Sequence, residues 1–332
     1  MIITRTPHRI SFFGGGTDYP SWYLKNDGKV LGVAIDKYCY LIVRKLPPFF
    51  ENKYKIVYSQ MEFPKTIDEI KHPSVRETLK YFNYKEGVSI HHDGDIPARS
   101  GMGSSSAFTV GLLKAMYALE GNIISKSDLF KLAINIEQNI IKENVGSQDQ
   151  VFAAYGGLNK IDFLKSGEIV VTPVVLKQEN LSLFDKKFML FFTGISRNAS
   201  DIAEEQIKNT NKNENELFKL SKLVDDAYDI LTSSKPEFGL FGKLLNETWK
   251  LKRSLSAKIS NSLIDNIYDT AMKNGAAGGK LLGAGGGGFM LFYVEPENQV
   301  KVKNALKNLI NITFEFDFSG SEIIVYKPEF YK

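Results

Sequence analysis

The sequence predicts a two-domain chain in which strands and helices are mixed. Its 332 residues exceed what one ordinary hydrophobic core serves, so two domains are expected. Several short apolar or alternating runs before residue 95 predict strands of a substantial sheet. These runs cover residues 2–6, 29–35, 39–45, 53–58 and 88–92. Helical patterns dominate residues 201–273, beginning with one long helix at 201–232, and closing strands are expected at 313–317 and 322–326. We place the boundary near residues 181–185, which gives domains 1–183 and 184–332.

Composition excludes several classes of function. The chain is 43% hydrophobic and 24% charged, a balance typical of soluble globular proteins. Its net charge of +4 is too weak and diffuse to indicate a nucleic-acid partner, although it suits a small anionic substrate. Cys39 alone forms no internal disulfide, and the four histidines lack the spacing of zinc ligands. Without an 18-residue apolar run or a signal peptide, we expect a cytoplasmic protein with no membrane partner.

A first glycine loop at residues 95–103 joins the predicted strand at 88–92 to a helical pattern that follows. Gly101 and Gly103 let a ligand approach the main chain closely. The free N–H groups and dipole of the next helix favour an anion, and the three serines at 104–106 can cap the helix or ligate a metal. A tight turn with a serine N-cap is the commoner explanation of such a loop. Its length, together with a second glycine loop downstream, favours a triphosphate cradle, and no Gly-Lys-Ser/Thr follows, so it is not a Walker A loop.

Two further glycine-rich segments demand an explanation. An N-terminal glycine turn at residues 14–18 follows an apolar run and ends in Asp18. Taken alone, it is either a flexible hairpin tip or a place where a ligand approaches the backbone. The second glycine loop, residues 283–288, contains four consecutive glycines between two apolar strands and makes a poor structural turn by itself. This favours a functional role for the second loop.

Two carboxylates lie between the first and second glycine loops. The segment from Ser125 resembles a capping box and opens a helix to about residue 144, in which Glu137 falls inside the apolar arc. A carboxylate that faces the core is either paired with a buried cationic side chain or bound to a metal. Asp149 heads a short helical run after Gly146, which a simple N-cap would explain.

These motifs together resemble the GHMP small-molecule kinases. The resemblance rests on Pro97-x-x-x-Gly101-Met-Gly103-Ser-Ser-Ser, on the N-terminal Arg9 with Gly-Thr-Asp18-Tyr, and on the second glycine loop. It covers nearly the whole chain, with the motifs in the family's order. It implies an α+β fold of two domains, the first like a domain of ribosomal protein S5 and the second ferredoxin-like. It also implies ATP between the domains, Mg²⁺ as cofactor, and a second glycine loop that packs against the first and completes the active site.

The resemblance implies roles for individual residues. Asp149 would accept the proton of the attacking hydroxyl, and Arg9 would keep that carboxylate ionised and neutralise charge on the transferred group. Glu137 and a serine, Ser105 by expectation, would hold Mg²⁺. The ATP phosphates would contact Arg99, Ser100, Gly101, Met102, Gly103, Ser104, Ser105 and Ser106. Substrate-binding residues would be Gly14, Gly15, Gly16, Thr17, Asp18, Asp149, Arg197, Gly285 and Gly286.

The predicted reaction is phosphoryl transfer from ATP to a sugar hydroxyl. Within the superfamily, Gln148-Asp-Gln150 followed by Tyr155-Gly-Gly is most similar to the heptose 7-phosphate kinases. The expected substrate is therefore D-glycero-D-manno-heptose 7-phosphate, phosphorylated at its anomeric hydroxyl for nucleotide-activated heptose. The alternative is another sugar 1-kinase, fucokinase-like or galactokinase-like, although galactokinases carry Glu-His at Gly15-Gly16. A non-catalytic sugar sensor or an RNA-binding module fits less well, and we expect a monomer or homodimer.

Overall fold

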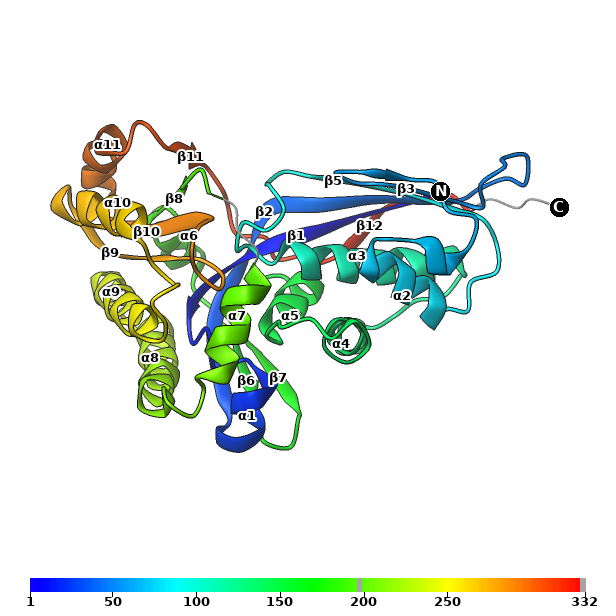
Figure 1. Ribbon diagram of the computed structural model, residues 1–332. Coiled ribbons are helices and arrows are strands. Elements are labelled where there is room, and N and C mark those ends of the chain that lie inside the picture. Colours follow the sequence, from blue (N-terminus) through cyan, green and yellow to red (C-terminus); the bar gives the residue numbers. More distant parts are fainter. Residues whose placement is uncertain (196–198, 329–332) are drawn as a thin grey trace.

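The computed structural model describes residues 1–195 and 199–328, which form two unequal sheets with helices at their sides (Figure 1). Over that range the larger sheet has eight strands and the smaller has four. The strands are β1 (Ile2–Phe13), β2 (Gly28–Lys45), β3 (Tyr54–Val57), β4 (Met61–Glu62), β5 (Val88–Gly94), β6 (Leu158–Phe163), β7 (Ile169–Pro173), β8 (Phe188–Phe192), β9 (Ala276–Leu281), β10 (Phe289–Val294), β11 (Ile310–Ile312) and β12 (Glu322–Tyr326).

The helices alternate with these strands and account for most of the second half. They are α1 (Pro20–Asn26), η1 (Ile67–Glu69), α2 (Pro73–Tyr81), α3 (Ser104–Leu119), α4 (Lys126–Ile134), η2 (Asn135–Ile141), α5 (Gln148–Tyr155), α6 (Gln178–Asp185), α7 (Ala199–Lys208), α8 (Glu214–Thr232), α9 (Phe238–Ser254), α10 (Ser262–Lys273) and α11 (Pro296–Ala305). In these described parts of the chain, no helix is both long and apolar enough to cross a membrane.

The larger sheet is built around the long antiparallel pair of β1 and β2. The first part of β2 also pairs with β6, and its last part pairs with β5, so one strand serves two neighbours in turn. The last strand, β12, returns to pair with β1, so residues near both chain ends share this sheet. Helix α3 packs on β1 and β2, and its nearly continuous apolar surface explains why it is buried between the sheet and the other helices.

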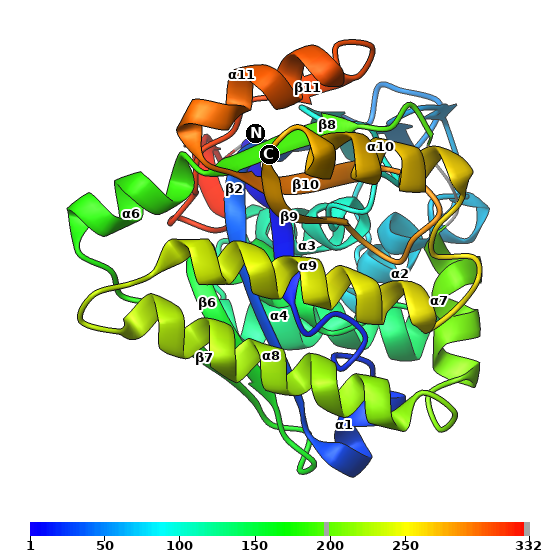
Figure 2. The ribbon, with the colours of Figure 1, turned by 90° about the vertical axis from the view of Figure 1, so that its left-hand side faces the viewer.

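The smaller sheet has the order β11-β8-β10-β9 and is antiparallel throughout. Helices α8 and α9 run alongside each other next to it (Figure 2). An aromatic cluster joins the two sheets: the ring of Phe12 on β1 lies 5.0 Å from that of Phe188 on β8 and 5.4 Å from that of Phe241 on α9. The end of β1 is therefore fixed against the second half of the chain by hydrophobic contact.

The α+β class is confirmed, and several predicted element boundaries change. The strand predicted at residues 2–6 continues to Phe13, and those at 29–35 and 39–45 are one strand. The register shifts where Pro7 pairs with Tyr38 and His8 pairs with Ile35, so the polar residues between form a bulge instead of ending the strand. The helix expected at 201–232 is two helices, α7 and α8. The strand expected at 313–317 is reduced to one bridge, between Ile35 and Phe316.

Candidate active site

A cleft of about 970 Å³ brings together segments that lie far apart in the sequence. It is lined by parts of the first glycine loop, the N-terminal glycine turn, the segment before Asp149 and the second glycine loop. The first strand contributes Arg9 and Ser11 to its wall, and α9 and β9 contribute Lys252 and Lys280. Both halves of the chain therefore share one cleft.

The two glycine loops contact each other through their backbones. A Cβ atom added at Gly283 would lie 2.4 Å from the Cα of Gly101, and one added at Gly101 would lie 2.6 Å from the carbonyl oxygen of Leu282. Both glycines also have positive φ angles, 71° and 81° respectively. Any side chain at either position would push the loops apart. The predicted meeting of the two loops is confirmed.

The first glycine loop leaves the N-terminus of α3 open to the cleft. Its N-cap residue is Gly103, with a φ of 76°, and no side chain caps the helix. Arg99 also has a positive φ, 59°, and its backbone N–H donates to Ser104 Oγ at 3.3 Å. Helix N–H groups without a cap bind anions well, because the helix dipole adds to their partial positive charge. The sequence predicts an anion site here, and the open N-terminus of α3 has the geometry for one.

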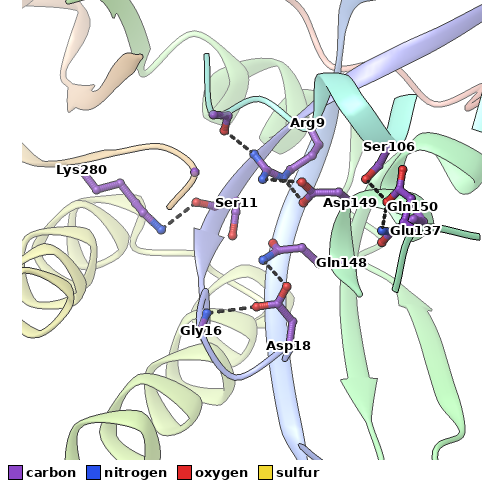
Figure 3. Close-up of polar contacts among 12 residues, drawn as sticks. Arg9, Ser11, Gly16, Asp18, Ser106, Glu137, Gln148, Asp149, Gln150 and Lys280 are labelled. Atoms are coloured by element: carbon purple, nitrogen blue, oxygen red, sulfur yellow. Dashed lines mark hydrogen bonds and ion pairs between the residues drawn. The ribbon is translucent and has the colours of Figure 1, made fainter. Parts of the chain in front are cut away.

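Arg9 and Asp149 form a two-point ion pair beside that helix N-terminus (Figure 3). Arg9 Nε donates to Asp149 Oδ1 at 2.7 Å and its Nη2 donates to Oδ2 at 3.0 Å. Its remaining nitrogen, Nη1, donates to the carbonyl of Gly101 at 2.8 Å. Such bidentate pairs fix both side chains. The ion pair packs against Gly103, because a Cβ added there would lie 3.3 Å from Asp149 Oδ2.

Glu137 is fully buried, as its position in the apolar arc predicts. It lies in η2, a π-helical continuation of α4, and irregular helical turns of this kind are common at functional sites. Its Oε2 accepts hydrogen bonds from Ser106 Oγ at 2.8 Å and from Gln150 Nε2. Its Oε1 has no hydrogen-bond partner in the part of the chain that is described. Burial raises the pKa of this carboxyl to about 7.

Asp18 is another carboxylate that lines the cleft, and it is 3% exposed. Its Oδ1 accepts from the backbone of Gly16 at 3.0 Å, and its Oδ2 accepts from Gln148 Nε2 at 2.8 Å. Burial, reinforced by the charge of Asp149, raises the pKa of the Asp18 carboxyl. A Cβ at Gly146 would lie 1.9 Å from Asp18 Oδ2, which explains the glycine at that position. Gln148 and Asp149, adjacent on α5, thus connect Asp18 to Arg9.

Two buried lysines were not predicted as site residues. Lys252 on α9 donates to the carbonyls of Leu281, at 3.1 Å, and Gly283. Lys280 on β9 donates to the carbonyls of Ser11 and Phe12, at 2.8 and 2.9 Å. A sequence signal existed for both. Lys280 is the charged residue in the otherwise uncharged segment 276–282, just before the second glycine loop. Lys252 follows the core residue Trp249 by three positions, so both lie on the same face of the helix.

An aromatic wall forms another part of the cleft. The ring of His72 stacks on Phe108 at 4.4 Å, and Tyr58 meets His72 edge-on at 4.9 Å. All three residues line the cleft, on the same side as the start of α2. Such a wall can stack against a flat heteroaromatic ring.

Several predicted site residues do not reach the cleft wall. Ser100 and Met102 are fully buried, and Thr17 Oγ1 donates to the carbonyls of Gly14 and Lys29, both at 2.8 Å, so it holds the turn. Gly15, Gly16 and Asp18 line the cleft, whereas Gly285 and Gly286 pack against Ile259. Residues that support the walls without lining them are Gly14, Thr17, Ser100, Met102, Gly285 and Gly286.

The serine beside Glu137 differs from the one expected, and Arg197 lies outside the described residues. The structure brings Ser106 to Glu137, whereas Ser105 is exposed at the start of α3. Helix periodicity explains the difference, because adjacent residues point about 100° apart and only one can face the buried acid.

Comparison with known proteins agrees with this geometry. The family model "GHMP kinases N terminal domain" matches residues 70–157, and "GHMP kinases C terminal" matches residues 234–311. The D-glycero-alpha-D-manno-heptose 7-phosphate kinase of Campylobacter jejuni is 31% identical over 328 residues, with 96% of each chain covered. The bifunctional fucokinase/GDP-fucose pyrophosphorylase of Arabidopsis thaliana is 25% identical over 343 residues, which are 94% of this chain but 31% of that protein.

Solved structures show the same fold. A D-glycero-D-manno-heptose 1-phosphate kinase from Bacteroides thetaiotaomicron superimposes with a TM-score of 0.80 at 22% identity, with both chains fully covered. A mevalonate kinase superimposes with a TM-score of 0.72 at 20% identity, over 96% of this chain and 99% of that one. With the family models and the Campylobacter relative, these likenesses lead to one conclusion: the chain belongs to the GHMP kinase family and is a phosphotransferase, a small-molecule kinase.

Proposed function

We propose that this protein transfers the γ-phosphoryl group of ATP to the anomeric hydroxyl of D-glycero-D-manno-heptose 7-phosphate, giving the 1,7-bisphosphate. The observation that carries the proposal is the position of the Arg9–Asp149 pair. It lies between the uncapped N-terminus of α3 and the buried carboxylate of Asp18. The 31% identity to the Campylobacter heptose 7-phosphate kinase supports the choice of sugar. The product would feed nucleotide-activated heptose.

The residues divide the chemistry between them. The N–H groups of α3 and the loop hydroxyls hold the ATP phosphates, and the wall of His72 and Phe108 stacks on the adenine. Asp149 accepts the proton of the anomeric hydroxyl as that oxygen attacks the γ-phosphorus and ADP departs. Arg9, held by Asp149 and Gly101, compensates the negative charge that develops on the transferred group. Asp18 accepts hydrogen bonds from the sugar.

The residues around Glu137 fit a magnesium ion. Mg²⁺ takes oxygen ligands and in kinases is held by one or two carboxylates plus the substrate phosphates. The unpartnered Oε1 of Glu137 and the hydroxyl of Ser106 supply that chemistry. When bound, the metal would neutralise charge on the nucleotide phosphates. No cluster of three or more acidic, histidine or cysteine side chains that could hold a metal ion is found among the described residues.

An ADP-release assay across three acceptors tests the proposal. Heptose 7-phosphate, fucose and galactose are compared at equal concentration with saturating Mg·ATP. We expect the largest kcat/KM for heptose 7-phosphate. Turnover of fucose or galactose with none of the heptose phosphate would identify another sugar 1-kinase of the same family and defeat the substrate assignment.

A further inference from the structure

We propose that Lys252, Lys280 and Ser11 form a subsite for the phosphate group that the acceptor already carries. The inference rests on the proposed function, since it names the group by which this site would recognise a sugar phosphate. The three residues come from α9, β9 and β1 and all line the cleft. Their contacts, burial and position each support an anion at this place.

Each lysine has a hydrogen-bond donor left for a ligand. An ammonium group has three N–H donors. Lys252 uses two on the carbonyls of Leu281 and Gly283, and Lys280 uses two on those of Ser11 and Phe12. Neither lysine makes an ion pair with a carboxylate among the described residues. Both retain one donor, and both lie at the cleft wall.

Burial makes this pair of cations costly without an anion. Lys280 is 1% exposed and Lys252 is 6% exposed. Burial, with the nearby positive charge of Arg9, lowers the pKa of Lys252 to about 7. Burial, with the nearby charges of Lys252 and Arg9, also lowers the pKa of Lys280 well below its usual value. The charge of Arg9 itself is already matched by Asp149. A phosphate dianion would compensate both lysines, because buried charges are stable only when paired and hydrogen-bonded.

Ser11 supplies an independent indication of a ligand. Ser11 is 5% exposed and lines the cleft, yet its hydroxyl has no hydrogen-bond partner in the described parts of the chain. Figure 3 places it next to the ammonium group of Lys280. A buried hydroxyl without a partner is unfavourable, and it could donate a hydrogen bond to a phosphate oxygen.

The position along β1 distinguishes the acceptor's phosphate from the transferred one. Arg9 and Ser11 are two residues apart, so both side chains face the same side of the strand, about 7 Å apart. The backbone N–H of Arg9 donates to Met102 in the first glycine loop, where ATP binds. Ser11 lies two residues further along β1, toward the N-terminal glycine turn. Its Oγ lies 3.8 Å from a Cβ placed at Gly15. The two lysines therefore face the end of the acceptor that lies away from the ATP phosphates.

A phosphate titration tests the subsite directly. The protein is first saturated with Mg²⁺ and a nonhydrolysable ATP analogue, which fills the nucleotide phosphate site, and inorganic phosphate is then titrated by calorimetry. We expect the wild-type protein to bind phosphate and Lys252→Met and Lys280→Met each to bind it roughly tenfold or more weakly, as loss of a charge-assisted hydrogen bond requires. Lys250→Met, an exposed lysine on the same helix, serves as the matched control and should match wild type. Retained affinity for the ATP analogue shows that the variants are folded.

Steady-state kinetics distinguishes a subsite for the acceptor's own phosphate from a site that binds the γ-phosphoryl group being transferred. With heptose 7-phosphate, each variant should raise KM roughly tenfold with a smaller change in kcat. With the same heptose lacking its phosphate, the variants and wild type should have equal KM. Equal losses of kcat with both acceptors, or phosphate binding that is absent in wild type or unchanged in both variants, would overturn the proposal. A wild-type enzyme that rejects heptose 7-phosphate refutes the proposed substrate, while the phosphate titration still decides the subsite.

Discussion

Replacing Glu137 with glutamine should change how stability depends on pH, in the absence of nucleotide and metal. The carboxyl is fully buried, and burial raises its pKa from 4.5 to about 7. Because the pKa is higher in the folded state, the folded protein binds this proton more tightly than the unfolded chain. Its contribution to the free energy of unfolding is therefore present below pH 4.5 and is lost as the pH rises through 7.

The two pKa values give the size of the effect. Between pH 5 and pH 8, ionisation of Glu137 removes about 2 to 3 kcal/mol from the free energy of unfolding of the wild type, by linkage from pKa values of 4.5 and about 7. Glu137→Gln has no proton to lose, so its free energy of unfolding should fall by about 2 to 3 kcal/mol less over the same interval. The comparison cancels the cost of placing an amide at this site, which is the same at both pH values.

Urea denaturation at pH 5 and pH 8 measures this difference. Glu247→Gln, a change at an exposed residue of α9, is the control and should follow the wild type. Added Mg·ATP should stabilise the wild type more than Glu137→Gln, because the ion would compensate the buried carboxylate. Equal pH dependence of wild type and Glu137→Gln would show that this carboxyl does not have the raised pKa its burial implies.

Three other substitutions test the remaining parts of the site. Asp149→Asn should lower kcat roughly 10²- to 10⁴-fold, the usual contribution of a general base, with the Kd for ATP unchanged; unaltered turnover excludes that role. Gly283→Ala should lower stability and raise the KM for ATP, because its Cβ would lie 2.4 Å from a Cα of the first glycine loop. Gly121→Ala, with a similar φ of 74° and open space around the added Cβ, should cost only about 1 kcal/mol of backbone strain, so equal effects would exclude loop contact as the cause. Gly146→Ala should displace Asp18 and raise the KM for the sugar, with no change in the KM for ATP; a rise in both would point to a wider collapse of the cleft.

The fold class and the meeting of the main motifs could be predicted because the motifs are strong local signals and their order resembles that of the GHMP kinases. Glycine runs that are costly as simple turns indicated functional loops, and the resemblance to the GHMP kinases implied that the second loop packs against the first; Gly101 and Gly283 are in such contact. The helical periodicity around Glu137 predicted its burial. The capping box at Ser125 is confirmed too, since its hydroxyl accepts from the backbone of Asp128.

What the sequence did not predict depends on contacts between distant segments. No local pattern tells which of three adjacent serines faces Glu137, since that is set by how α3 packs against η2. Lys252 and Lys280 were overlooked because a lysine usually lies at the surface, and only the tertiary structure shows their partners on the second glycine loop and β1. The bulge that keeps β2 continuous past Asp36 likewise needs the register of β1.

The most direct test of the account is to identify the product by ³¹P NMR. Wild-type protein, Mg·ATP and D-glycero-D-manno-heptose 7-phosphate should give ADP and a sugar with two phosphates, the new one coupled to the anomeric proton. Asp149→Asn under the same conditions should leave the heptose phosphate unchanged. A new phosphate on any other hydroxyl, or no product from the wild type, would contradict the assignment of Asp149 as the base facing an anomeric hydroxyl.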